Sequence, residues 1–167
     1  MNIHKDLKTY FEANPVANFK NFAKSKSWDL VNDGFYSVAF YVEGIWKNYL
    51  VALSWLEKNQ QLKLTCEYDL NLPKDNISSF YKTLNLANEK CNEGYFTFCE
   101  DEKVLVFHNQ YKGSDALEIE NRRTREIIAE TTSLMDELYP VFQLISWGKE
   151  TPDMALKLAS QHSSGFI

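Results

Sequence analysis

Apolar side chains recur every three or four residues in five stretches of the chain, the spacing that places them on one face of an α-helix. The second stretch opens with Asn14 and Pro15, a pair typical of a helix start. Pro140 falls inside the longest stretch, where we expect it to kink the helix. Gly148 then favours a left-handed cap, and Thr151 opens the last helix. The predicted helices occupy residues 2–13, 15–25, 77–91, 115–147 and 151–159.

Elsewhere apolar and polar residues alternate, which is typical of half-buried strands. The predicted strands occupy residues 35–42, 45–56, 61–69, 95–99 and 104–111. Short turns join the first three into an antiparallel meander, and the last two form a second hairpin. The order of elements is therefore α-α-β-β-β-α-β-β-α-α, which indicates an α+β fold with a five-stranded antiparallel sheet and helices packed on one face.

Composition narrows the class of protein. The 167 residues are 44% hydrophobic, which fits one domain over residues 1–167 with a helical extension at residues 1–13. The net charge of −5 argues against a broad nucleic-acid or anionic-membrane binder. No apolar run approaches the roughly 18 residues of a membrane span, and charges interrupt the N-terminus where a signal peptide would be apolar. Cys66, Cys91 and Cys99 show no C-x-x-C spacing and fit a reducing cytoplasm.

No motif of catalysis, phosphate binding or metal binding is visible in the sequence. His108 stands among apolar neighbours in a strand, which favours a structural histidine over a general base. Glu67 and Asp69 point to one face of their strand, where they either face solvent or share a proton or a cation. Acidic residues 100–102 sit at a hairpin tip, where such residues are ordinary. We therefore expect no metal, no cofactor and no enzymatic activity.

The aromatic residues suggest an interaction surface. The chain has 4 Trp, 9 Tyr and 11 Phe, and about half of them fall in the predicted strands. Alternation sends neighbours such as Phe40 and Tyr41 to opposite faces, and helices on one side of a sheet cover only one of the two sets. Either the tyrosines tolerate water while the phenylalanines face the core, or a second subunit or peptide covers the other face. The candidate strand residues are Tyr36, Tyr41, Tyr49 and Trp55.

Arg122, Arg123 and Arg125 form the one basic cluster, near the start of the longest predicted helix. Cations there oppose the helix dipole, but a glutamate such as Glu126 offsets this through i, i+4 pairing. The cluster is either a solvated, salt-bridged face or a docking site for an acidic partner or phosphate.

Several sequence phrases stand out in order along the chain. The most characteristic are residues 42–46 (Val-Glu-Gly-Ile-Trp), 64–70 (Leu-Thr-Cys-Glu-Tyr-Asp-Leu) and 138–143 (Leu-Tyr-Pro-Val-Phe-Gln). Others are Asn14-Pro15, Trp28, Leu53-Ser54-Trp55, residues 84–89, Gly94-Tyr95-Phe96 and Trp147-Gly148. Together they resemble the YbjN family of bacterial sensory-transduction regulators, over roughly residues 14–159. The resemblance implies a fold like that of type III secretion chaperones and a protein that acts through protein contacts.

These patterns together predict a non-catalytic, cytoplasmic, chaperone-like or regulatory protein-interaction module of the YbjN type. Its partner is expected to be an unidentified protein, and the chaperone-like fold also allows a homodimer. Nucleic acid and membranes are not expected partners. The alternative hypothesis is a small-molecule-binding protein that uses a pocket between the sheet and the helices.

Overall fold

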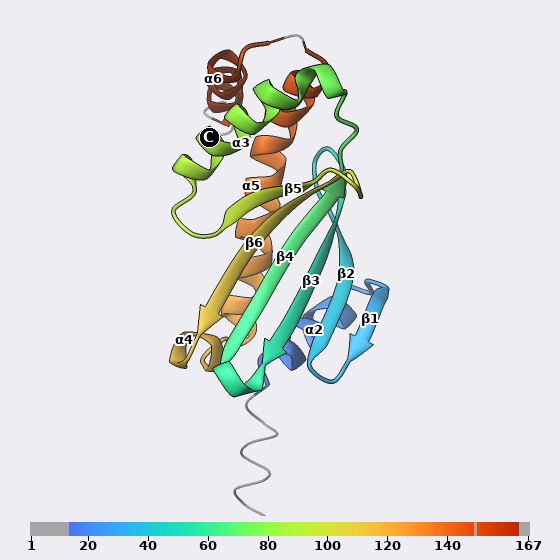
Figure 1. Cartoon of the computed structure of the whole chain (residues 1–167). Helices are drawn as coiled ribbons and strands as arrows, with labels where there is room; N and C mark the ends of the chain where they lie inside the picture. The colour runs from blue at the N-terminus through green and yellow to red at the C-terminus, as the bar shows by residue number, and fades with distance from the viewer. Residues whose placement is uncertain (1–13, 149, 164–167) are drawn as a thin grey trace, which may run out of the picture.

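The computed structural model describes residues 14–148 and 150–163, so the helix expected at residues 2–13 lies outside the described residues. An elongated sheet carries helices along one side and across one end (Figure 1). The strands β1 to β6 span Leu30–Gly34, Ser37–Glu43, Asn48–Leu56, Gln61–Asp69, Tyr95–Cys99 and Val104–Lys112. The helices α2 to α6 span Val16–Ser25, Ile77–Lys90, Ser114–Leu117, Asn121–Ser146 and Pro152–Ser163, and the 3-10 turns η1 and η2 span Glu57–Asn59 and Lys74–Asn76.

The described strands form one antiparallel sheet of six strands in the order β1-β2-β3-β4-β6-β5. The prediction of five strands was therefore wrong, because β1 was missed. This strand is a short edge strand in which Val31, Asn32 and Asp33 are all exposed, so it shows no alternation. A bulge between Leu30 and Asn32 also shifts its register against β2. The α+β class and the antiparallel pairing are confirmed.

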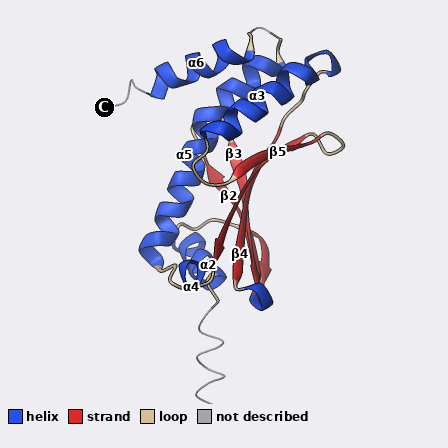
Figure 2. Cartoon of the chain, turned by 60° about the vertical axis from the view of Figure 1, so that its left-hand side comes forward, coloured by secondary structure: helices blue, strands red, loops and turns tan. Residues whose placement is uncertain are grey.

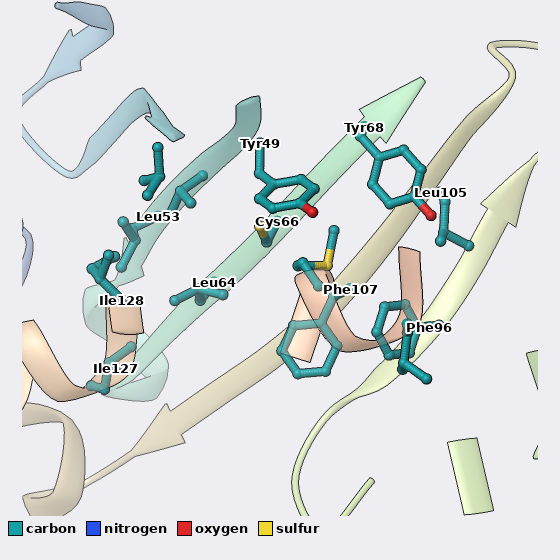
Figure 3. Close-up of a cluster of buried hydrophobic side chains, with 14 of the residues drawn as sticks. Tyr49, Leu53, Leu64, Cys66, Tyr68, Phe96, Leu105, Phe107, Ile127 and Ile128 are labelled. Atoms are coloured by element: carbon teal, nitrogen blue, oxygen red, sulfur yellow. The ribbon is translucent and has the colours of Figure 1, made fainter. Parts of the chain in front are cut away.

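Helices cover one face of the sheet. Helix α5 runs along this face, α2 and α4 lie near its first turns, and α3 and α6 cross its other end (Figure 2). The core lies between, where Ile127 and Ile128 of α5 meet Leu53 of β3 and Leu64 of β4 (Figure 3). We call this the covered face, and the opposite side of the sheet the open face.

Alternation along β3 shows which side chains each face receives. Tyr49 and Trp55 belong to the covered face and are 0% and 7% exposed, so their placement on an exposed interaction surface was wrong. Their set also contains Val51 and Leu53, and it is the more apolar of the two sets, which is why the helices pack on it.

The end of α5 and the start of α6 show the predicted local signals. Gly148 has a φ of +66° and donates its N–H to the carbonyl of Ile145, which confirms the left-handed cap after α5. Thr151 Oγ1 accepts a hydrogen bond from the N–H of Met154 at 3.4 Å, as expected at the start of α6. Helix α5 begins later than predicted, because the chain first forms the short α4 and then buries Ile119.

Candidate interaction surfaces

The open face has small and apolar side chains at its centre. Ala39, Ala52 and Thr65 lie side by side across β2, β3 and β4 in one row of the register. In the next row Tyr41 pairs with Leu50, which in turn pairs with Glu67; Glu67 then pairs with Val106 of β6. Tyr41 is 52% exposed and Ala39 is buried, and the other residues of these rows are half-buried.

At the β5 edge of the open face, His108 of β6 contacts Tyr95 and Thr97 of β5. The ring of Tyr95 stacks on the imidazole of His108 at 5.0 Å between centroids. Thr97 Oγ1 lies 2.8 Å from His108 Nε2. Partial burial lowers the pKa of His108, so the neutral ring is favoured. The partners of His108 are thus a ring and a hydroxyl, as expected for a structural histidine.

Glu67 is the half-buried acid of the open face. Burial raises the pKa of its carboxyl group, and the negative charges of Glu102 and Asp69 raise it further. Glu67 and Asp69 do share a face, as predicted. Within the described ranges no group of three or more His, Cys, Asp or Glu side chains is placed to hold a metal ion.

The tip of the β2–β3 hairpin is fastened to the middle of α5 by Asp136. Asp136 Oδ1 accepts hydrogen bonds from the N–H of Ile45 at 2.9 Å and from the hydroxyl of Tyr49 at 2.7 Å. Trp46 stacks nearly parallel on Tyr139 of α5, with 6.3 Å between centroids. A Cβ at Gly44 would stand 2.2 Å from the Tyr49 ring and 2.6 Å from Asp136 Oδ1, so only glycine fits at this turn.

Tyr68 of β4 lies beside this junction. Its ring packs against Tyr49 and Tyr139 at 5.8 and 5.1 Å between centroids. Its hydroxyl is buried and has no hydrogen-bond partner within the described part of the chain. The neighbouring hydroxyl of Tyr49, by contrast, is bonded to Asp136.

Two of the three clustered arginines are paired with glutamates of their own helix, and the third bonds to a main-chain carbonyl. Arg122 Nε donates to Glu126 Oε1 at 2.9 Å, and Arg123 Nη1 donates to Glu130 Oε1 at 2.9 Å. Arg125 Nε donates to the carbonyl of Asn121 at 3.3 Å. This pattern agrees with a salt-bridged helix face.

The seven predicted surface residues do not form one surface. Tyr41 points to the open face, whereas Arg122, Arg123 and Arg125 stand on α5, which packs on the covered face. Tyr36 lies in the β1–β2 turn and donates from its hydroxyl to Glu57 at 3.1 Å.

A polar groove of about 720 Å³ lies at the end of β6, between the sheet and the helices. The loop before β5, the last residues of β6, helix α4 and the first turn of α5 form its walls. Its lining residues are Glu93, Gly94, Asn109, Gln110, Tyr111, Lys112, Asp115, Glu118 and Arg123. Tyr111 is partly buried there, and burial together with Glu93 and Glu130 raises its pKa to about 12, although Arg123 acts in the opposite direction.

The comparisons with known proteins agree with this fold. The sequence profile of YbjN, described as "putative bacterial sensory transduction regulator", matches residues 15–144. The chain belongs to the YbjN family. The crystal structure of YbjN, described as "a putative transcription regulator from E. coli", is similar with a TM-score of 0.50 and 6% identity, over 89% of this chain and 93% of that chain. At that identity the match shows the fold alone. No curated protein matches the chain.

The YbjN resemblance seen in the sequence has a structural basis at the hairpin tip. Two of its phrases, residues 42–46 and 138–143, meet where Trp46 stacks on Tyr139. A third, residues 64–70, contributes Tyr68 to the same aromatic cluster. These phrases therefore meet at one packing junction of this chain, and Asp136 at its centre was missed because a single aspartate within a helix carries no motif.

None of the helices in residues 14–148 and 150–163 has the length and apolar character to cross a bilayer.

Proposed function

We propose that the chain is a non-catalytic, cytoplasmic regulatory module that binds a partner protein through the open face of its sheet. Membership of the YbjN family supports a regulatory or interaction role in general. The observation that carries the proposal is the row of Tyr41, Leu50, Glu67 and Val106, which is apolar or aromatic except for Glu67 and which no described element of the chain covers. An uncovered apolar sheet face is a frequent mark of an interaction surface.

The form of this surface favours a protein over a metabolite as its occupant. Ala39, Ala52 and Thr65 are short, so the centre of the open face is low and broad rather than enclosed. Tyr41 and Tyr95 stand at the borders as exposed rings, the residue type enriched in protein interfaces. In a chaperone-like role, this face would shield an apolar segment of the partner from water.

Site-specific crosslinking tests the proposal in living cells. A photoreactive phenylalanine at position 52 lies at the centre of the open face, and the same residue at position 129 lies on the exposed side of α5. We expect position 52 to yield one defined protein adduct and position 129 to yield none. Tyr41→Ala should reduce the adduct at position 52, whereas Tyr81→Ala, which removes an exposed ring from α3, should not. Equal adduct yields from both positions, or no adduct from position 52, would contradict the proposal.

A small-molecule-binding role is the second candidate, and the polar groove at the end of β6 is the observation that favours it. Its volume of about 720 Å³ is sufficient for a metabolite, and its walls carry both acidic and basic side chains. A thermal-shift screen tests it, because a ligand that binds only the native state raises the melting temperature, and the shift grows with the logarithm of ligand concentration above the Kd. Lining variants such as Glu118→Gln should then abolish the shift.

A further inference from the structure

The last residues of β6 form a strand edge that pairs with no other strand in the described part of the chain. Strand β5 begins at Tyr95, which pairs with His108, but β6 continues to Lys112. Beyond His108, β6 pairs with β4 on one side only, through the pairs that run to Gln61 and Lys112. The groove of about 720 Å³ lies along this unpaired stretch.

The hydrogen-bond alternation of the sheet shows which backbone groups face the groove. Gly113, directly after β6, donates its N–H to the carbonyl of Gln60 at 2.8 Å. Because the backbone hydrogen-bonding direction alternates along a strand, the N–H and C=O groups of the odd-numbered residues of β6 point toward β4. The backbone N–H and C=O of Gln110 and Lys112 consequently point to the other side, into the groove. The N–H of Gln110 is held by the side chain of its own neighbour, Asn109 Oδ1, at 2.7 Å.

The chain's own connection to β5 turns away from this stretch. Gly94 has a φ of +78°, and a Cβ there would stand 2.4 Å from the carbonyl oxygen of His108. This tight turn leads the chain back toward α3, where Cys91 Sγ donates to the carbonyl of Ala87 at 3.4 Å. The positions that an extended β5 would occupy opposite Gln110 and Lys112 are therefore left to the groove.

The neighbouring edge on the same side of the sheet is blocked. Asn88 of α3 donates from Nδ2 to the carbonyl of Phe96 at 3.1 Å and accepts from its N–H through Oδ1. The amide side chain thus replaces a strand partner on the outer edge of β5. Helix α3 offers no such contact to Gln110 or Lys112.

We propose that this edge binds an extended segment of a partner protein, which adds a short strand to β6 at Gln110 and Lys112. Pairing through the backbone is an established mode of peptide recognition. The side chains around the edge select a basic segment, because Glu93, Asp115 and Glu118 line the groove without an ion pair in the described structure. Of the two cations there, Arg123 is already bound to Glu130.

The proposal rests on the proposed function only in taking the partner to be a protein, since it concerns a different surface. A substitution at Tyr41 tests the open face, and a substitution in the groove tests the edge. Each surface can therefore fail without the other.

Peptide titration of the full chain gives the first test. The probe is a fluorescent eight-residue peptide of alternating Lys and Thr, and two matched peptides accompany it. One has Glu in place of Lys, and the other is N-methylated at alternate residues and so lacks half of its backbone donors. We expect the basic peptide to bind at least tenfold more tightly than either. Hydrogen exchange should show at least tenfold protection of the Lys112 amide on binding.

Variants locate the site. Glu118→Lys reverses a charge in the groove, and Asp101→Lys makes the same change at the far β5–β6 turn. We expect Glu118→Lys to weaken the basic peptide at least tenfold and Asp101→Lys to leave it within twofold. The proposal is overturned if no peptide binds, if the N-methylated peptide binds equally well, or if both variants weaken binding alike. Occupation of the groove by a metabolite that leaves peptide binding unchanged would also overturn it.

Discussion

The indole nitrogen of Trp46 donates a hydrogen bond of 3.0 Å to the main-chain carbonyl of Asp136. Within a helix this carbonyl normally accepts from the N–H four residues later, but that residue is Pro140, which has none. The hairpin tip thus supplies the donor that the helix lacks, and α5 continues through the proline to Ser146.

A double-mutant cycle measures the coupling between the indole N–H of Trp46 and the missing N–H of Pro140. Trp46→Phe keeps an aromatic ring but removes the N–H, and we expect a loss of about 1 kcal/mol in the free energy of unfolding. Pro140→Ala restores a helical N–H to the carbonyl of Asp136, so the same Trp46→Phe change should cost less in that background. Urea denaturation of the four proteins checks it. Equal costs in both backgrounds would show that the two donors are unrelated.

Two neighbouring tyrosines should respond in opposite directions to loss of the hydroxyl. Tyr68→Phe removes a buried hydroxyl that has no partner in the described chain, so we expect a gain of about 1 kcal/mol in unfolding free energy. Tyr49→Phe removes the donor to Asp136 Oδ1, so we expect a loss of about 1 to 2 kcal/mol. Chemical denaturation of both variants decides the matter. A loss of stability in Tyr68→Phe would mean that its hydroxyl has a favourable contact.

Removal of the amide that covers β5 should make the protein self-associate. Asn88→Ala exposes the N–H and C=O of Phe96 at the sheet edge, where a second molecule can pair with them. We expect light scattering to show a dimer whose fraction rises with protein concentration. We also expect the free energy of unfolding to fall by about 1 to 2 kcal/mol. Asn85→Ala is the control, since Asn85 lies on the same helix but bonds only to Glu89 in the described contacts. A monomeric Asn88→Ala would refute the covering role.

Glu67→Gln should stabilise the protein at neutral pH and not at acidic pH. The pKa of Glu67 is raised above its ordinary 4.5 in the folded protein, so the folded state resists ionisation of this group. The penalty is absent well below the ordinary pKa, where the group is protonated in both states. It grows between the ordinary and the folded pKa and stays constant at higher pH, where the group is ionised in both states. We expect a gain of about 0.5 kcal/mol at pH 7 that disappears near pH 4. Thermal unfolding across this range measures it, and a gain independent of pH would exclude the charge as its cause.

Much of the sheet could be predicted from the sequence because apolar and polar residues alternate clearly along its central strands. The bounds of β4 and β5 agree with those expected, since β4 alternates cleanly and β5 lies between turn residues. The edge strand β1 could not be found in this way, because an edge strand with three exposed residues in a row has no pattern to detect. Strand pairing across the sheet supplies its stability instead.

The candidate surface was harder to predict than the fold. Tyr49 and Trp55 are aromatic like Tyr41, so residue type alone does not separate buried from exposed rings. Only the shared strand face with Val51 and Leu53 indicates that Tyr49 and Trp55 point to the core. The groove depends on where β5 begins relative to the end of β6, a relation between strands that no single segment encodes. Asp136 contacts residues about 90 positions away in the chain, so its role follows from the fold alone.

The placement of β6 between β4 and β5 has a consequence for synthesis on the ribosome. Strands β1 to β4 can pair with one another as they emerge, but β4 finds its second partner only after α3 and β5 have been made. During that interval the long edge of β4 is bare, and α5, which covers the apolar face of the meander, has not yet been translated. The nascent chain is therefore most prone to aggregation in this interval, and a slower ribosome would prolong that exposure.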